Sequence, residues 1–367
     1  MRSISIVALA VCSLGCDLES DDDAPPPPTP HAVAPSVTTA RFGLVVQRGP
    51  AGGREVLDPA DGTVIPVTGP GGAALTWILP LPRGDQLLAT TASGVLRGRV
   101  GESIAWEPAP LSSGTTPPRV SGSDASGDTL VLDRAGTAEY GVVYELARGA
   151  STVPLVEVAY PGGASVSADG AAIVVSGTPM PCPDLRRCPV LLWRVDEAGA
   201  LARIPTPEDR AAYKPQILDE DGQRWLVYQT TAYDDSPECA GNLNRCRHDI
   251  VRRRFPEGPE ELVARGAIAF AAGPVGRRAW LTPDSAECLD ITCPTMRLHL
   301  IDRVVGDRVI DERAGSVTPL AFSPDGTWLV YRDRAADEIR VVHLGTLAIR
   351  VLGAGAPIGW IRLPGAR

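Results

Sequence analysis

Residues 322–333 read FSPDGTWLVYRD, and this stretch decides the fold. The run 328–331 (WLVY) has the residue types of a β-strand, and Asp325-Gly326 has the chemistry of a two-residue turn, so a β-hairpin is predicted here. Two more strands are expected at 338–344 (EIRVVHL) and 346–352 (TLAIRVL). The whole unit is therefore a four-stranded antiparallel sheet joined by short turns.

Five weaker copies of this unit lie upstream. The first two strands of each copy, followed by its third strand, are expected at 77–91 and 95–100, 119–133 and 141–147, 165–177 and 190–196, 216–230 and 248–255, and 267–281 and 296–302. Copies separated by about 45 residues are typical of β-propeller blades. No long amphipathic helical pattern interrupts them, which argues against a parallel α/β sheet.

The two ends of the chain complete the count of sheets. Residues 42–48 and 54–68 supply three strands of a sheet that lacks its first strand, and 357–363 (PIGWIRL) is a first strand with no sheet after it. Joining them would close the ring and remove exposed sheet edges. The sequence thus predicts an all-β protein, a β-propeller of seven four-stranded blades closed by its C-terminal strand. Six or eight blades are the alternatives.

The unit at 322–352 resembles the TolB-like, WD40-like repeat of bacterial β-propellers. The resemblance implies the propeller fold and suggests protein partners in the cell envelope. Because one fold serves many functions, it does not identify the ligand.

The N-terminus reads as an export signal. Residues 1–16 (MRSISIVALAVCSLGC) place Arg2 before a short apolar stretch at 4–11, as in a secretory leader. The end of this stretch resembles the lipobox of bacterial lipoproteins, which implies a signal peptide at 1–15 and a lipidated Cys16. Cleavage by ordinary signal peptidase at the same bond is the alternative.

The next segment, 16–40, is acidic and rich in proline, and we expect it to be an extended tether before a propeller at 41–367. This organisation predicts a protein of the bacterial cell envelope, lipid-anchored to a membrane and facing the periplasm or the cell surface. No apolar run of 18 residues follows residue 16, so no helix is expected to span the membrane. The net charge of −9 and the lack of a basic stripe argue against a nucleic-acid partner.

Six cysteines of the mature chain fall in three close pairs. All three pairs lie between the second and third strands of consecutive copies: Cys182 and Cys188, Cys239 and Cys246, and Cys288 and Cys293. In an exported protein such pairs indicate local disulfides. Zinc is the alternative, but the spacings are longer than is usual for zinc sites and histidines are scarce. We expect no metal and no cofactor.

No catalytic residue is predicted. The chain has no G-x-S-x-G, H-E-x-x-H, phosphate-binding or dinucleotide-binding motif. Of its four histidines, His31 falls in the expected tether, and His248, His299 and His343 fall at or near third strands. We therefore expect a non-enzymatic interaction scaffold. The alternatives are a propeller enzyme of the lyase or glycosidase type and a carbohydrate or small-ligand binder, either with its site at the central channel.

The connections between second and third strands at 178–189, 231–247 and 282–295 are expected to emerge on one face and form a continuous arc. Long loops of this kind are often functional. The candidate binding residues are the charged side chains Asp184, Arg186, Arg187, Asp234, Asp235, Glu238, Arg245, Arg247, Asp284, Glu287 and Asp290. The alternative is that the disulfides only protect the loops from proteolysis. We expect a monomer that binds protein partners of the envelope.

Overall fold

The computed structural model divides into two units, Met1–Thr39 and Ala40–Arg367. It describes residues 40–49, 53–81, 84–109, 118–137, 141–182, 188–207, 210–232, 247–284, 295–302, 306–312, 320–333 and 335–364. The predicted signal peptide, Cys16 and residues 16–39 of the tether lie outside these ranges. All the described strands belong to the second unit.

The described part of this unit is built from strands and two 3-10 turns, Pro70–Gly72 and Pro274–Gly276. The first half of the strands is β1 (Phe42–Gln47), β2 (Arg54–Leu57), β3 (Val64–Val67), β4 (Trp77–Pro80), β5 (Gln86–Thr91), β6 (Gly94–Val100), β7 (Ile104–Pro108), β8 (Arg119–Ser123), β9 (Thr129–Ala135), β10 (Val142–Arg148), β11 (Ser151–Val166), β12 (Ile173–Pro179), β13 (Leu191–Val195) and β14 (Leu201–Ile204).

The second half is β15 (Arg210–Glu220), β16 (Gln223–Ala232), β17 (His248–Arg254), β18 (Glu261–Arg265), β19 (Ala269–Ala272), β20 (Arg278–Pro283), β21 (Met296–Asp302), β22 (Gly306–Asp311), β23 (Ala321–Phe322), β24 (Trp328–Asp333), β25 (Glu338–His343), β26 (Ala348–Ala354) and β27 (Ala356–Arg362). In the described ranges, no helix is long and apolar enough to cross a membrane. The protein is therefore all-β, as the sequence predicts.

These strands form antiparallel sheets whose members mostly follow one another along the chain. Five sheets have four strands each: β4 to β7, β15 to β18, β19 to β22, β23 to β26, and β27 with β1 to β3. One sheet has seven strands, β8 to β14. Strand β11 joins its two halves, because its N-terminal part pairs with β10 and its C-terminal part with β12. Register shifts near Tyr160 and Gly163 mark the change of partner.

The last strand shares a sheet with the first. β27 pairs antiparallel with β1, with Leu44 opposite Trp360 and Phe42 opposite Arg362. The segment 357–363 therefore lies beside the strand that begins at Phe42, as predicted. The Trp360 indole Nε1 also donates a hydrogen bond of 3.1 Å to the carbonyl oxygen of Ala321 in β23.

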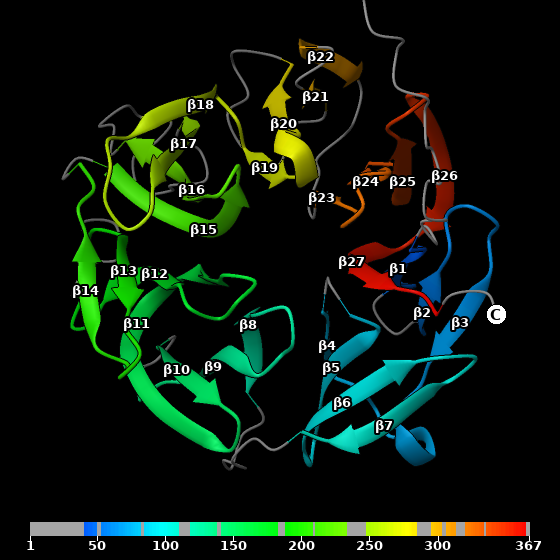
Figure 1. Cartoon of the computed structure of the whole chain (residues 1–367), viewed down its shortest axis with the longest axis horizontal. Coiled ribbons are helices and arrows are strands. Elements are labelled where there is room, and N and C mark those ends of the chain that lie inside the picture. Colours follow the sequence, from blue (N-terminus) through cyan, green and yellow to red (C-terminus); the bar gives the residue numbers. More distant parts are fainter. Residues whose placement is uncertain are drawn as a thin grey trace, which may run out of the picture. The chain divides into compact units, whose positions relative to one another are not determined.

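The hydrophobic core is divided into seven clusters in the described residues. Six of them contain residues of two neighbouring sheets, and the seventh contains residues from both halves of the seven-stranded sheet. Leu88 of β5 packs with Leu132 of β9 in one cluster. Leu44 of β1 packs with Val330 of β24 in another. Figure 1 shows the sheets of this unit around a common centre, with β4, β8, β15, β19, β23 and β27 innermost.

The Asp-Gly sequences are turns, but of two kinds. Asp221-Gly222 is a two-residue turn with φ of 52° and 72°. At Asp325-Gly326 the predicted two-residue turn is wrong. There the Ser323 amide donates to the Trp328 carbonyl at 2.8 Å, so four residues lie between the closing pair. The Ser323 hydroxyl donates to the Asp325 carboxylate at 2.6 Å and stabilises this longer loop.

Candidate functional site

The three connections predicted to form an arc join β12 to β13, β16 to β17 and β20 to β21. Each links the second and third strands of a four-stranded group, as expected from the sequence. Because these strands alternate in direction, the three connections leave their sheets at the same end of the strands. Most of the predicted arc lies outside the described residues: Asp184, Arg186, Arg187, Asp234, Asp235, Glu238, Arg245, Glu287 and Asp290, with Cys239, Cys246, Cys288 and Cys293.

The described residues of the arc are held at the bases of the loops. A disulfide joins Cys182 to Cys188 across the first loop. Arg247 lies 3.6 Å from the carboxylate of Asp249, and Asp284 forms an ion pair of 2.5 Å with Arg297. The Asp284 amide also donates to the Thr295 carbonyl at 3.2 Å, which closes the base of the third loop.

Replacing Cys182 and Cys188 together by serine should lower the free energy of unfolding by about 2 kcal/mol. A disulfide removes loop-closure entropy from the unfolded chain, and this ring is short. Chemical denaturation of the wild-type and double-variant proteins measures the difference. An unchanged midpoint would mean that the bond does not constrain the unfolded chain.

A buried polar group supports the second loop. His248 is the first residue of β17 and only 3% exposed. Its Nδ1 contacts the hydroxyls of Tyr213 in β15 and Thr231 in β16. These contacts connect three strands at the residues that flank the loop 231–247, so His248 has a structural role.

Sequence reasoning missed Lys214, which lies in the innermost strand β15. It has a φ of 53° in a β-bulge between Tyr213 and Gln216, and proline follows it. A left-handed conformation is unfavourable for a residue with a side chain, and bulges often re-aim a side chain at functional sites. The signal that could have found it is compositional: Lys214 is the one lysine of the chain, beside 34 arginines.

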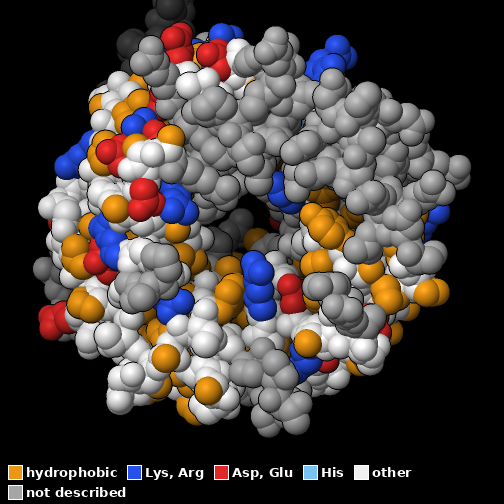
Figure 2. Space-filling model, turned by 180° about the vertical axis from the view of Figure 1, so that it is seen from behind, with side chains coloured by type: hydrophobic (Ala, Val, Ile, Leu, Met, Phe, Trp, Pro, Cys, Tyr) orange, Lys and Arg blue, Asp and Glu red, His pale blue; other side chains and the backbone are white. Residues whose placement is uncertain are grey.

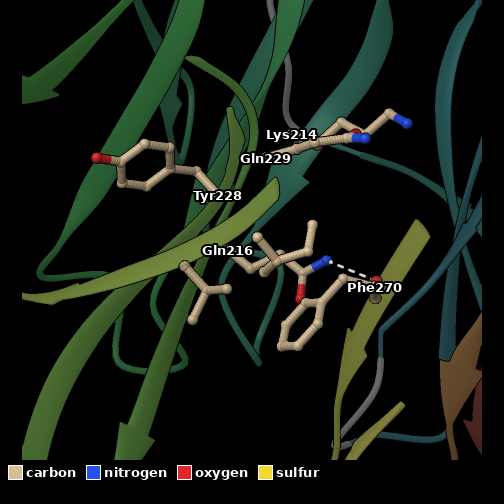
Figure 3. A pocket seen from close by; sticks show the side chains of 7 residues that line it. Lys214, Gln216, Tyr228, Gln229 and Phe270 are labelled. Atoms are coloured by element: carbon tan, nitrogen blue, oxygen red, sulfur yellow. Dashed lines mark hydrogen bonds between the residues drawn. The ribbon is translucent and has the colours of Figure 1, made fainter. Parts of the chain in front are cut away.

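Lys214 lines a small cavity of about 30 Å³, room for about one water molecule. The other lining residues are Gln216, Val227, Tyr228, Gln229, Ile250 and Phe270. Figure 3 shows Lys214 and Gln229 extending in the same direction and Gln216 reaching the Phe270 carbonyl. That last contact is a hydrogen bond of 3.4 Å from Gln216 Nε2.

Lys214 is the cationic group that lines this cavity. Lys214 is exposed to solvent, yet desolvation by the surrounding protein atoms lowers the pKa of its ammonium group. Among the described residues it makes no ion pair, whereas Arg224 pairs with both Asp169 and Asp219. Figure 2 shows a hollow at the centre of the sheets with basic side chains at its rim. Lys214 is thus a cationic side chain without an ion-pair partner among the described residues, in a chain whose net charge is −9.

Within the described ranges, no group of three or more His, Cys, Asp or Glu side chains could hold a metal ion. The carboxylates of Asp61, Asp169 and Asp325 in the Asp-Gly turns bind arginine or groups of their own loop. Asp169, for example, accepts hydrogen bonds from Ser167 at 2.6 Å and Arg224 at 2.7 Å, and these contacts lower the pKa of its carboxyl group. These aspartates are turn residues.

Comparison with known proteins gives the class of fold. No protein-family model matches the chain. Its sequence is 28% identical over 172 residues to Tricorn protease homolog 1 of Streptomyces coelicolor. The match covers 45% of this chain but only 14% of that protein. The chain thus spans a small part of this relative.

Two solved structures show the same fold at low sequence identity. The β-propeller domain of the Trilobed protease from Pyrococcus furiosus matches 76% of this chain and 83% of its own, with 12% identity and a TM-score of 0.52. Oligogalacturonate lyase matches 77% of this chain and 79% of its own, with 12% identity and a TM-score of 0.54. A weaker similarity, to TolB from Acinetobacter baumannii, covers 88% and 83% of the two chains, with 11% identity and a TM-score of 0.46. The chain has the fold of the β-propeller proteins.

Proposed function

We propose that the protein is a closed propeller of seven blades. Counting β11 once with β8 to β10 and once with β12 to β14 turns the seven-stranded sheet into two blades, and the other five sheets supply the rest. The seven core clusters fit this count, because a closed ring has as many interfaces as blades. The pairing of β27 with β1 is the contact that closes the ring.

We further propose that the protein is exported and anchored to a membrane of the bacterial cell envelope by lipid on Cys16. The leader at 1–16 supports this proposal, as does the Cys182–Cys188 disulfide, which is characteristic of exported proteins. Mass spectrometry of the mature N-terminus should find an acylated Cys16. An unmodified cysteine, or an intact leader, would contradict the anchor.

On this anchor we propose that the propeller acts as a non-enzymatic scaffold for envelope proteins. One observation carries the proposal: the loops 178–189, 231–247 and 282–295 connect the second and third strands of three neighbouring blades, and so leave these blades at the same end of the strands. A loop held by a disulfide loses less conformational entropy when a partner binds, so the stapled loop is preorganised for binding. At the bases of the other two loops, the side chains of Arg247 and Asp284 are 51% and 40% exposed, so a partner can reach them.

The test replaces the charged residues of the arc by alanine, one loop at a time, and leaves the cysteines in place. A partner is first captured by pull-down with the lipid-anchored protein, and its affinity is then measured for each variant. The matched controls are three exposed acids near the opposite end of the strands in the same blades, where the third strand connects to the fourth: Glu197, Glu257 and Asp307. We expect the arc variants to lose binding and the controls to keep it. Binding that survives all three arc variants and fails in the controls would overturn the proposal.

A further inference from the structure

Lys214 stands apart from every other cationic residue of the chain. The protein uses arginine 34 times and lysine once. Arginine is always charged and binds paired acceptors through a planar fork, whereas lysine is a compact point charge with three donors. The described arginines near acidic groups form ion pairs, as Arg340 does with Asp333 at 3.0 Å. Lys214 makes no ion pair with any described residue, so its ammonium is available to a ligand.

The backbone of Lys214 has an energetically unfavourable conformation. Its φ of 53° lies in the left-handed region that glycine would adopt without strain. Pro215 follows it, and both residues lie outside the regular pairing of β15 with β16. Strain of this kind persists where the surrounding structure fixes it, and it is concentrated at binding and catalytic sites. The side chain therefore lines the cavity from a backbone conformation that stability alone does not favour.

Gln229 supplies a second, independent observation. This residue of β16 is 2% exposed. Its Nε2 donates to the carbonyl oxygens of Ala267 at 3.3 Å and Ile268 at 3.4 Å. These two acceptors fix the orientation of the amide, so the oxygen must lie on the other side. That Oε1 atom is buried and has no hydrogen-bond partner among the described residues. A buried acceptor without a donor is costly unless a ligand or water satisfies it.

We propose that Lys214 and Gln229 form a binding site for a carboxylate that carries an N–H or O–H group beside it. The Lys214 ammonium donates to the carboxylate, and Gln229 Oε1 accepts from the adjacent donor of the ligand. The cavity has room for one small group of the ligand, and the rest of the ligand lies outside the cavity. A phosphate dianion fits less well, because the site offers one cation and a carbonyl oxygen that repels negative charge.

Two sources present this chemistry: a free amido or hydroxy acid and the C-terminus of a peptide. N-acetylglycine serves as the small probe, N-acetyl-triglycine as the peptide probe, and N-acetylglycinamide as the control without a carboxylate. Because the chain has one lysine, labelling the full-length protein with ε-¹³C-lysine gives a single signal, from Lys214. Binding of either acid should shift this signal saturably and raise the pKa of Lys214. The amide should leave both unchanged.

Variants assign the contacts. Lys214→Met should weaken binding of the acids by about tenfold or more, measured by titration calorimetry, because a charge-assisted hydrogen bond is lost. Gln229→Met should weaken it by about three- to tenfold. Arg308→Met, at an exposed position on β22, is the matched control and should bind like the wild type.

Lys214→Gly keeps the proposal testable if the methionine variant does not fold, since glycine adopts the same φ without strain. It should fold and fail to bind. Tighter binding of the triglycine acid would identify a peptide C-terminus as the ligand, and equal binding a small acid. A signal that neither acid moves, or that the amide moves as much, would overturn the proposal. This result is independent of the arc, so either proposal can fail alone.

Discussion

Deleting residues 355–367 is expected to give a protein that melts far below the full-length chain or aggregates. The deletion removes β27, which pairs with β1 along its whole length. It also removes Trp360 and Ile361, which are 3% and 0% exposed and belong to two different core clusters. Loss of a buried tryptophan alone costs about 3–5 kcal/mol. The deletion also leaves β1 and the sheet β4 to β7 with uncovered surfaces that favour aggregation.

The matched control deletes only residues 365–367, which follow β27. Thermal unfolding and size-exclusion chromatography of the two shortened proteins separate the effect of β27 from that of a shorter chain. If the larger deletion were as stable and monomeric as the control, β27 would not hold the sheets together.

Leu88→Ala is expected to destabilise the protein by about 2–5 kcal/mol, the cost of a large cavity in a core. Leu88 of β5 is 0% exposed and packs against Leu130 and Leu132 of β9 across two sheets. The control is Leu262→Ala in β18, where the leucine is 52% exposed. That variant should stay within about 0.5 kcal/mol of the wild type.

Denaturant unfolding measures both variants under the same conditions. The large difference is expected because the core of this protein lies between sheets, and β18 is an outer strand (Figure 1). Equal effects of the two substitutions would mean that the contact between β5 and β9 contributes little to stability.

The fold could be predicted because the determining signals are local and repeated. The repeated alternation of strands and turns located the first three strands of each copy, and the incomplete sheets at the two ends indicated that 357–363 pairs with β1. Hydrogen bonds between side chains and the backbone were harder to predict from the sequence than the strands were. Ser323 changes the turn at Asp325-Gly326 because its hydroxyl competes for the local donors and acceptors.

Strand β11 is a second feature that the sequence did not predict fully. The sequence suggested a fourth strand of one blade and a first strand of the next, but residues Ser151–Val166 form one bent strand. The bend lies at Pro161 and Gly163, where proline lacks a donor and glycine has a φ of 111°. Whether such a segment breaks or bends depends on the neighbouring strands rather than on its own residues.

Some features of the candidate sites could be predicted from the sequence, and others could not. The strands that the three connections join could be predicted because turn positions follow from strand order, and the binding role of the arc stays a prediction. The site at Lys214 could not be predicted from spacing, because its geometry depends on a bulge in β15 and on carbonyls of the next blade that orient Gln229. The single lysine among 34 arginines was the one sequence signal, and it lies in composition rather than in a motif.

Photocross-linking in the cells that express the protein tests the proposed scaffold most directly. A photoreactive amino acid is placed at Arg247 or Asp284 on the arc. In separate variants it is placed at Glu257 or Asp307, near the opposite end of the strands in the same two blades. We predict protein adducts of discrete mass from the two arc positions and none from the two opposite positions. Adducts that form only from Glu257 and Asp307 would contradict the arc as the partner-binding surface.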